Sequence, residues 1–362
     1  MRALTLMLAC AAAGFAAAAP AASPAADAPQ KPTFQDDGTV NVPAFQLPPS
    51  ALISPQAAAM QRMRGHMPVV ATAMDPDVTK ARAQLEQFMA PQVAQVRKLY
   101  PADVVDARMG GVPVRVVTPT GKPVDPKRVL INLHGGAFSV CADGCARIES
   151  LPIASLGGFK VVTVNYRMAP EARHPAAVED VAAVYRELLK SYRPSQIGVY
   201  GCSAGGALTA ETAAWLPSHG LPQAGAIGIF GAGGVRFAQG DSAYVAAYID
   251  GSFPAPARPG DPPTPSIDRG YFSAADHDDP IVSPALHPDV MAKFPPTLLI
   301  TGTRAMDMSP AIFTNSQLLK AGVRSTLIVG EGQGHCYVMM PQLPEAQDAY
   351  QEIVRFFQEN LH

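Results

Sequence analysis

Short apolar runs alternate with amphipathic segments along residues 112–362, and this alternation restricts the folds that the chain can adopt. The runs are rich in valine and isoleucine, which is typical of strands buried on both faces. We expect strands at residues 114–117, 129–133, 161–166, 197–200, 226–230, 298–301 and 326–329. We expect helices at residues 177–189, 207–216, 310–319 and 345–361. Buried strands that alternate with helices predict an α/β fold, with a mostly parallel sheet flanked by helices.

One strand-to-helix junction carries a reactive-serine pattern. Residues 201–205 read GCSAG, which fits G-x-S-x-G, and they lie between an expected strand and an expected helix. In that context the serine sits on a sharp turn, and glycine neighbours let the strand and the helix approach closely. The helix N-terminus also supplies N–H groups that favour negative charge. Ser203 is therefore the candidate nucleophile, and an ordinary glycine-rich turn is the alternative.

A glycine pair follows an expected strand and predicts an oxyanion hole. Residues 134–138 read HGGAF, which resembles the HGGG loop of lipases and esterases, with Ala137 at the third glycine position. Each donor of such a hole contributes about 3–4 kcal/mol to transition-state stabilisation. We expect His134 to hold the loop through a hydrogen bond. The candidate donors are the backbone N–H groups of Gly135, Gly136, Ala137 and Ala204.

Two later loops supply the partners that a serine nucleophile needs. His335 lies on a glycine-rich loop after the last expected strand, and it is the candidate general base. Asp307 follows the expected strand 298–301 and is the candidate acid that orients the imidazole. Two alternatives stay open for the acid. Glu331 lies in the histidine loop itself, and Asp307 is also placed to cap the helix near residue 310.

The N-terminus has the pattern of an export signal. Arg2 precedes an apolar stretch over residues 3–18, which is too short to span a bilayer, and small residues follow it. We predict a signal peptide at residues 1–22 and a disordered leader, rich in alanine and proline, at residues 23–39. The mature chain is then expected outside the cytoplasm, either periplasmic or secreted.

Two segments are expected to surround the site rather than to carry its chemistry. Residues 40–108 contain two helix-start signals, at Ser54 and Asp75, and Pro91 is expected to interrupt the second helix. The methionines of this segment either pack in a core or form the apolar face of a mobile cap over a pocket. We predict a helical cap segment at 40–108. The catalytic domain is expected at 109–362, and its residues 231–285 read as an irregular insertion that walls the site.

Charge and cysteine usage narrow the remaining classes of function. A net charge of −2 predicts no nucleic-acid partner and no polybasic membrane patch. The sequence contains no pair of cysteines or histidines with the spacing of a zinc site, so we expect no metal and no cofactor. Cys141 and Cys145 either form a disulfide or remain free thiols. Cys202 and Cys336 flank Ser203 and His335, and both are expected to be small packing residues.

Together these motifs resemble one known family. HGGAF at 134–138, NYRMAPE at 165–171 and GCSAGG at 201–206 are similar to the hormone-sensitive-lipase-like α/β-hydrolases, the bacterial family IV esterases. The resemblance implies an α/β-hydrolase core with a helical N-terminal cap. It also implies hydrolysis of small-molecule esters with short to medium acyl chains, without a cofactor, and a homodimer through an edge strand. The alternatives are an amidase or peptidase with the same triad, and a non-catalytic exported binding protein on the same fold.

Overall fold

The computed structural model describes residues 31–63, 73–237, 239–250, 253, 255–256 and 266–362. It divides into two units, Met1–Pro48 and Pro49–His362, which are described separately. The predicted signal peptide at 1–22 lies outside the described residues. In the first unit, β1 (Thr33–Phe34) pairs with β2 (Val40–Asn41) in an antiparallel ladder. The prediction of a disordered leader did not include this hairpin, whose turn is closed by the Asp37 carboxylate accepting the Thr39 N–H.

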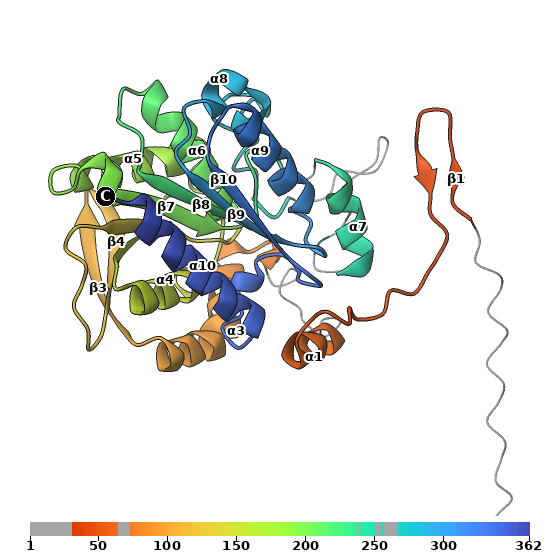
Figure 1. Ribbon diagram of the computed structural model, residues 1–362, viewed down its shortest axis with the longest axis horizontal. Helices are drawn as coiled ribbons and strands as arrows, with labels where there is room; N and C mark the ends of the chain where they lie inside the picture. Colours follow the sequence, from red (N-terminus) through yellow and green to blue (C-terminus); the bar gives the residue numbers. More distant parts are fainter. Residues whose placement is uncertain (1–30, 64–72, 238, 251–252, 254, 257–265) are drawn as a thin grey trace, which may run out of the picture. The chain divides into compact units, whose positions relative to one another are not determined.

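The second unit contains an eight-stranded sheet in the order β10-β9-β8-β7-β5-β6-β4-β3 (Figure 1). From β5 to β10 every neighbouring pair is parallel, and β4 and β3 run antiparallel at one edge. The predicted α/β fold with a mostly parallel sheet is therefore confirmed. The strands are β3 (Ala102–Met109), β4 (Val112–Pro119), β5 (Val129–Leu133), β6 (Lys160–Val164), β7 (Ile197–Cys202), β8 (Ala226–Phe230), β9 (Thr297–Gly302) and β10 (Ser325–Gly330).

Strand β3 lies inside the segment that was predicted to be helical. Its first strand residue is Ala102, so the end of the 40–108 segment belongs to the sheet rather than to a helical cap. It carries polar residues such as Asp103, Asp106 and Arg108, because an edge strand exposes much of its surface. That composition produces no apolar run, which is why the sequence did not indicate this strand.

Helices cover both faces of the sheet and enclose two apolar cores (Figure 1). One core contains buried side chains of α5 (Ala176–Leu188), α6 (Ala204–Ser218) and α9 (Met308–Lys320). The other contains those of α3 (Val78–Leu99), α4 (Gly144–Gly157) and α10 (Pro344–Asn360). The central strands β5, β7 and β8 are buried along their whole length between these layers. This burial on both faces explains their apolar sequences.

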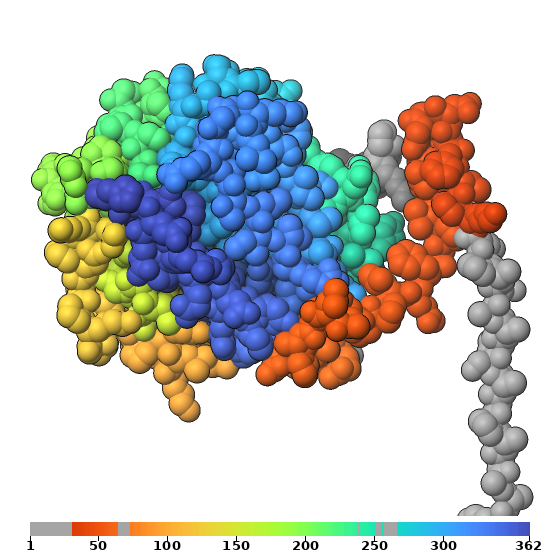
Figure 2. Space-filling model, in the orientation of Figure 1, coloured from red at the N-terminus to blue at the C-terminus, as the bar shows by residue number. Residues whose placement is uncertain are grey.

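The N-terminal helices of this unit pack on the same side as the C-terminal helix. Helix α1 (Pro55–Met63) follows Ser54, whose N–H and Oγ both donate to the Glu345 carboxylate at the start of α10, at 2.7 and 2.9 Å. Figure 2 shows the orange atoms of α1 against the blue C-terminal segment. Helix α3 continues through Pro91, which was expected to interrupt it. Met60 is partly buried against the core, whereas Met63 is exposed.

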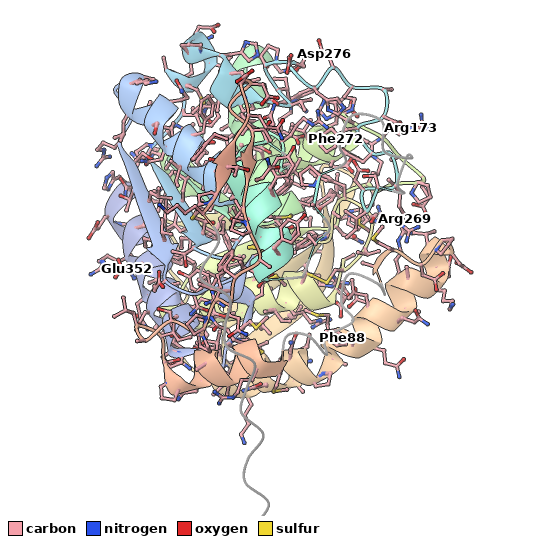
Figure 3. All side chains as sticks on the ribbon, turned by 90° about the vertical axis from the view of Figure 1, so that its right-hand side faces the viewer. Phe88, Arg173, Arg269, Phe272, Asp276 and Glu352 are labelled. Carbon is pink, nitrogen blue, oxygen red and sulfur yellow. A yellow bond between two sulfur atoms is a disulfide. The ribbon has the colours of Figure 1, made fainter. Side chains whose placement is uncertain are left out.

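The described residues of the predicted insertion at 231–285 include regular structure. The insertion contains α7 (Asp241–Ile249), which the expectation of an irregular segment did not include. Its later part packs tightly, because the buried Tyr271 ring stacks on Phe138 with ring centroids 4.5 Å apart. Arg269, labelled in Figure 3, donates to the backbone oxygens of Ala73 and Asp75 at 2.9 and 2.6 Å. The insertion is thereby tied both to the HGGAF loop and to the segment that precedes α3.

The described part of the second unit also contains short helical elements. These are η3 (Pro284–Leu286), α8 (Pro288–Met291) and η4 (Tyr337–Met339). A further turn, η2 (Pro194–Gln196), leads into β7. Among the described residues, none of the helices combines the length and the apolar character that a bilayer span requires.

Candidate active site

Ser203 occupies the sharp turn between β7 and α6. Its φ of 59° and ψ of −123° place a non-glycine residue in a conformation that costs about 1–3 kcal/mol. The neighbouring glycines are required by close packing against β5. A Cβ atom on Gly201 would lie 2.1 Å from the Leu133 carbonyl oxygen, and one on Gly205 would lie 1.7 Å from it. The glycines of the GCSAG pattern therefore hold the serine in its strained position.

The structure brings the three predicted side chains together at the carboxyl ends of the parallel strands. Ser203 Oγ lies 2.9 Å from His335 Nε2, and His335 Nδ1 lies 2.5 Å from Asp307 Oδ1. With the Nδ1 proton donated to the carboxylate, Nε2 is free to accept the serine proton. Asp307 is fully buried, and its second oxygen accepts a hydrogen bond from Thr301 Oγ1 at 2.5 Å. Two acceptor oxygens and two donors fix the carboxylate orientation.

The position of each carboxylate decides which residue is the acid of the site. Glu331 is exposed, and the carboxylate that contacts His335 is that of Asp307. Asp307 does stand at the N-cap position of α9, but its side chain makes no capping hydrogen bond there. The Asp307 carboxylate is instead committed to His335 and Thr301.

The HGGAF loop lies beside Ser203, but one of its predicted donors is engaged elsewhere. The Gly135 N–H donates to Glu149 Oε1 at 2.8 Å, so this residue leaves the predicted set of oxyanion-hole donors. Within the part of the chain that the structure describes, the N–H groups of Gly136, Ala137 and Ala204 have no hydrogen-bond acceptor. Gly136 has a φ of 112°, and a Cβ atom there would lie 2.0 Å from the Val140 carbonyl oxygen. Ala137 adopts a positive φ of 51°, which suits the glycine of the HGGG pattern.

His134 supports the loop, as expected. Its Nδ1 atom lies 2.7 Å from the Gly135 carbonyl oxygen, and its ring stacks on Tyr166 with centroids 4.3 Å apart. The Tyr166 hydroxyl donates to the His134 carbonyl oxygen at 2.7 Å. Complete burial lowers the pKa of His134 to about 4, so the ring is neutral at physiological pH.

A buried carboxyl that the sequence did not indicate joins the two halves of the site. Glu149 of α4 accepts hydrogen bonds from the Gly135 N–H, from Asn132 Nδ2 at 3.0 Å and from the Cys202 N–H at 3.2 Å. It therefore connects the HGGAF loop to the turn that carries Ser203. Burial raises the pKa of the Glu149 carboxyl to about 8, although the three donors favour its charged form. In the sequence, the only indication of this role was a single carboxylate in a mostly apolar segment.

The raised pKa of Glu149 predicts a stability that depends on pH. The folded-state pKa lies above the ordinary value of 4.5, so the folded chain binds the proton more tightly than the unfolded chain. The contribution of this group is complete below about pH 4.5 and decreases until the pH passes about 8. The slope amounts to at most about 1.4 kcal/mol per pH unit.

Urea unfolding at a series of pH values tests this effect. The Glu149→Gln variant cannot titrate at this position, so its free energy of unfolding should vary less than that of the wild type between pH 5 and 8. Glu187→Gln, at a helix position where the side chain is 40% exposed, is the matched control and should leave the slope unchanged. Parallel curves for the wild type and Glu149→Gln would contradict the assignment.

Both cysteine pairs of the described chain are disulfides. Cys141 and Cys145 are bonded, with Cα atoms 5.4 Å apart, which decides between the two alternatives left open by the sequence. Cys202 and Cys336 are also bonded, with Cα atoms 6.1 Å apart. Their interpretation as packing residues was therefore wrong. The two cysteines are 134 residues apart, so the sequence does not indicate that they pair. Only the folded sheet brings their two loops together.

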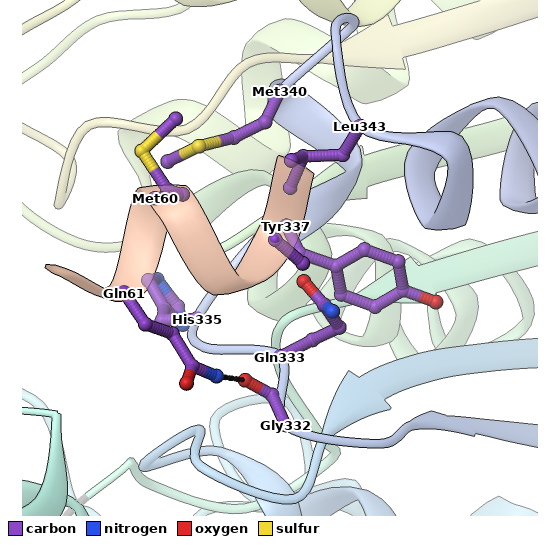
Figure 4. A pocket seen from close by; sticks show the side chains of 9 residues that line it. Met60, Gln61, Gly332, Gln333, His335, Tyr337, Met340 and Leu343 are labelled. Atoms are coloured by element: carbon purple, nitrogen blue, oxygen red, sulfur yellow. Dashed lines mark hydrogen bonds between the residues drawn. The ribbon is translucent and has the colours of Figure 1, made fainter. Parts of the chain in front are cut away.

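The histidine loop contacts helix α1 and two aromatic rings. Gln61 Nε2 donates to the Gly332 carbonyl oxygen at 2.7 Å, at the edge of a small pocket that Met60, Met340 and His335 also line (Figure 4). Phe237 and Phe253 face the His335 ring edge to face, with centroids 6.1 and 5.2 Å away. These apolar neighbours reduce the access of water to the imidazole. Among the described residues, no cluster of histidine, cysteine or acidic side chains has the arrangement of a metal site.

Comparisons with known proteins agree with this geometry. Residues 130–339 match the model of a family described as alpha/beta hydrolase fold. A segment of 120 residues is 36% identical to versiconal hemiacetal acetate esterase stcI of Emericella nidulans, and it covers 32% of this chain and 40% of that esterase. A segment of 163 residues is 34% identical to carboxylesterase NlhH of Mycobacterium tuberculosis, covering 40% of this chain and 47% of that protein. The chain thus spans less than half the length of these two relatives.

Solved structures resemble the chain over a larger share of its length. The crystal structure of an esterase E25 superimposes with a TM-score of 0.73 at 27% identity, over 89% of this chain and 99% of that chain. An esterase from the bacterial hormone-sensitive lipase family superimposes with a TM-score of 0.71 at 25% identity, over 85% and 99% of the two chains.

Proposed function

The chain belongs to the alpha/beta hydrolase fold family, and on that premise we propose that it is a carboxylesterase of the hormone-sensitive-lipase type. Its substrates are small-molecule carboxylic esters with short to medium acyl chains. The main support is the hydrogen-bonded series Asp307, His335 and Ser203, beside backbone N–H groups that have no acceptor among the described residues. This combination brings a nucleophile, a base and an anion site together at the carboxyl ends of the parallel strands.

The acylation step uses each of these groups in turn. Ser203 Oγ attacks the ester carbonyl carbon while His335 Nε2 takes the hydroxyl proton. Asp307 stabilises the imidazolium that forms, without accepting the proton itself. The negative oxygen of the tetrahedral intermediate is held by the N–H groups of Gly136, Ala137 and Ala204. The intermediate collapses as His335 gives its proton to the departing alcohol, which leaves an acyl group on Ser203.

The deacylation step repeats the same sequence with water. His335 removes a proton from a water molecule, and the resulting hydroxide attacks the acyl carbon. The same three N–H groups stabilise the second tetrahedral intermediate, and Ser203 leaves as the hydroxyl after it recovers the proton. No further group is required to balance either step.

Relatives and apolar contacts support the preference for short acyl chains. The names of two relatives, versiconal hemiacetal acetate esterase and the acetyl-hydrolase LipR of Mycobacterium tuberculosis, refer to acetyl groups. In this chain the His335 imidazole is bordered by Phe237, Phe253 and the pocket under α1. Side chains this close to the reacting atoms limit the length of the acyl group that fits beside them.

A series of p-nitrophenyl esters tests the proposed function. We expect kcat/KM to be highest among the acetate, butyrate and hexanoate, and to be lower by at least about ten-fold for the dodecanoate, because Phe237 and Phe253 beside His335 limit the room for added methylenes. The matched p-nitroanilide of the best acyl group should react far more slowly. A preference for the anilide would instead favour an amidase or peptidase, and a chain that no fluorophosphonate labels would be a non-catalytic binding protein.

We also propose that the mature chain acts outside the cytoplasm, in the periplasm or after secretion. The apolar leader at 1–22 supports this location, as do the two disulfides, because such bonds persist in oxidising compartments. N-terminal sequencing of the chain from a periplasmic extract tests the proposal, and an intact Met1 on all of the active protein would contradict it.

A further inference from the structure

The Cys202–Cys336 disulfide is adjacent to both reacting side chains. Cys202 directly precedes Ser203, and Cys336 directly follows His335. The bond thus links the end of β7 to the loop between β10 and η4, across 134 residues of sequence. Cys202 is fully buried and Cys336 is 8% exposed, so the bond lies behind the catalytic groups rather than on the surface.

The bond and the catalytic hydrogen bond join the same two segments. Ser203 Oγ and His335 Nε2 are 2.9 Å apart, and the Cα atoms of the neighbouring cysteines are 6.1 Å apart. Any displacement of the histidine loop away from β7 would therefore lengthen both connections at once. The disulfide limits that displacement covalently, whereas the hydrogen bond alone does not.

Backbone contacts at Gly332 and Gln333 hold the N-terminal side of the histidine loop, and the Tyr350 hydroxyl holds the chain beyond the bridge by donating to the Val338 carbonyl oxygen. The Gly332 N–H donates to Thr303 Oγ1 at 2.8 Å, and the Gln333 carbonyl oxygen accepts the Arg304 N–H at 3.0 Å. Both contacts direct the loop toward β9 and not toward the serine. Within the described chain, the only hydrogen bond between residues 331–336 and residues 201–205 is that of His335 with Ser203. Cys336 itself has a positive φ of 51°, so the backbone turns sharply at the bridge.

The end of β8 leaves space for the bridge. A Cβ atom on Gly231 would lie 2.5 Å from Cys336 Sγ and 3.0 Å from Cys202 Sγ. The Gly231 N–H donates to the Ile300 carbonyl oxygen at 2.8 Å, which fixes this glycine to the neighbouring strand β9. The two sulfur atoms therefore sit in a closely bounded site between the strand ends that carry the catalytic residues.

From these contacts we propose that the Cys202–Cys336 disulfide is a positioning element of the active site, and that full turnover requires its oxidised form. The inference rests on the proposed esterase function. A dithiol reductant would transfer two electrons and two protons to the bridge, giving two thiols and the cyclic disulfide of the reductant. Two separate thiols cannot remain at bonding distance, so the His335 loop moves away from Ser203. A disulfide donor reverses the step, and an exported chain would become active only after it leaves the reducing cytoplasm.

Reduction of the wild type by dithiothreitol tests the proposal. The assay is hydrolysis of p-nitrophenyl butyrate, with free thiols titrated and far-UV circular dichroism recorded on the same samples. We expect kcat to fall about 10- to 100-fold while KM changes little, because misplacement of a catalytic group by about 1 Å has effects of this size. Oxidised glutathione should restore kcat. A bond that only stabilised the fold would lower the melting temperature and leave kcat of the folded protein unchanged.

Two double variants assign the effect to this bond. Cys202→Ser with Cys336→Ser should have the low kcat of the reduced wild type and no response to dithiothreitol. Cys141→Ser with Cys145→Ser keeps the Cys202–Cys336 bond, so its loss of activity on reduction should persist.

Three results would overturn the inference or its premise. A folded Cys202→Ser/Cys336→Ser variant with wild-type kcat would overturn the inference. If that variant does not fold, a reduced and folded wild type with full kcat would do the same. An oxidised wild type without any hydrolysis would refute the proposed function itself, and fluorophosphonate labelling of Ser203 separates these cases.

Discussion

The Ser203→Ala variant is expected to lose about a million-fold in kcat for p-nitrophenyl butyrate, which places it at the background of the assay. The reason is that no other hydroxyl lies at the hydrogen-bond distance of 2.9 Å from His335 Nε2 among the described residues. Removal of the oxygen leaves the base and the oxyanion donors in place without a nucleophile. The fold should be unaffected, because His335 is the hydrogen-bond partner that Ser203 Oγ has among the described residues.

A serine at the other end of the same helix provides the matched control. Ser218 is exposed and its Oγ donates to the Trp215 carbonyl oxygen at 2.8 Å, far along the chain from the reactive turn. Ser218→Ala should keep wild-type turnover and react with a fluorophosphonate, whereas Ser203→Ala should do neither. A folded Ser203→Ala protein with substantial turnover would remove Ser203 from the mechanism.

The Asp307→Asn variant is expected to lose about ten-thousand-fold in kcat with little change in structure. The Asp307 carboxylate is buried and accepts hydrogen bonds from His335 Nδ1 and Thr301 Oγ1. An asparagine amide can satisfy Thr301 with its oxygen, but its NH₂ group then faces Nδ1. The imidazole would adopt the other tautomer, with the proton on Nε2, and would be unable to accept the proton of Ser203.

Glu331 provides the control for this substitution, since the sequence left it open as the acid. Glu331 is exposed, so Glu331→Gln should keep nearly normal turnover. Near-normal kcat in Asp307→Asn together with a large loss in Glu331→Gln would reverse the assignment. The paired comparison also separates an effect on the triad from a general effect of removing one negative charge.

The local sequence was sufficient to predict the structure where a residue's conformation depends on its immediate neighbours. The apolar runs predicted the strands from β4 to β10. For the central strands β5, β7 and β8 the physical reason is that strands buried on both faces tolerate few polar residues. The GCSAG and HGGAF patterns located the serine turn and the anion loop for a similar reason. Their glycines are needed where backbone atoms of β5 and residue 140 pass within contact distance.

Local sequence failed where burial and partners come from elsewhere in the fold. Helix α4 contains Pro152, and neighbouring elements bury it on nearly every side, so its sequence shows no amphipathic helical period. Pro91 lies within α3 without ending it. The prediction of Gly135 as an oxyanion donor failed because its N–H meets Glu149, fourteen residues later and on another element.

The sequence by itself determined the kind of sheet, the turn that carries Ser203, and the order in which nucleophile, acid and base follow one another. Each of these properties can be predicted from a short sequence pattern, because backbone sterics and burial act on neighbouring residues. Only the tertiary structure decided that Asp307 rather than Glu331 meets His335, that Glu149 joins the two loops, and that Cys202 bonds to Cys336. Those contacts connect residues 14 to 134 positions apart in the sequence. Residues so far apart meet only because the strands that carry them lie side by side in the sheet.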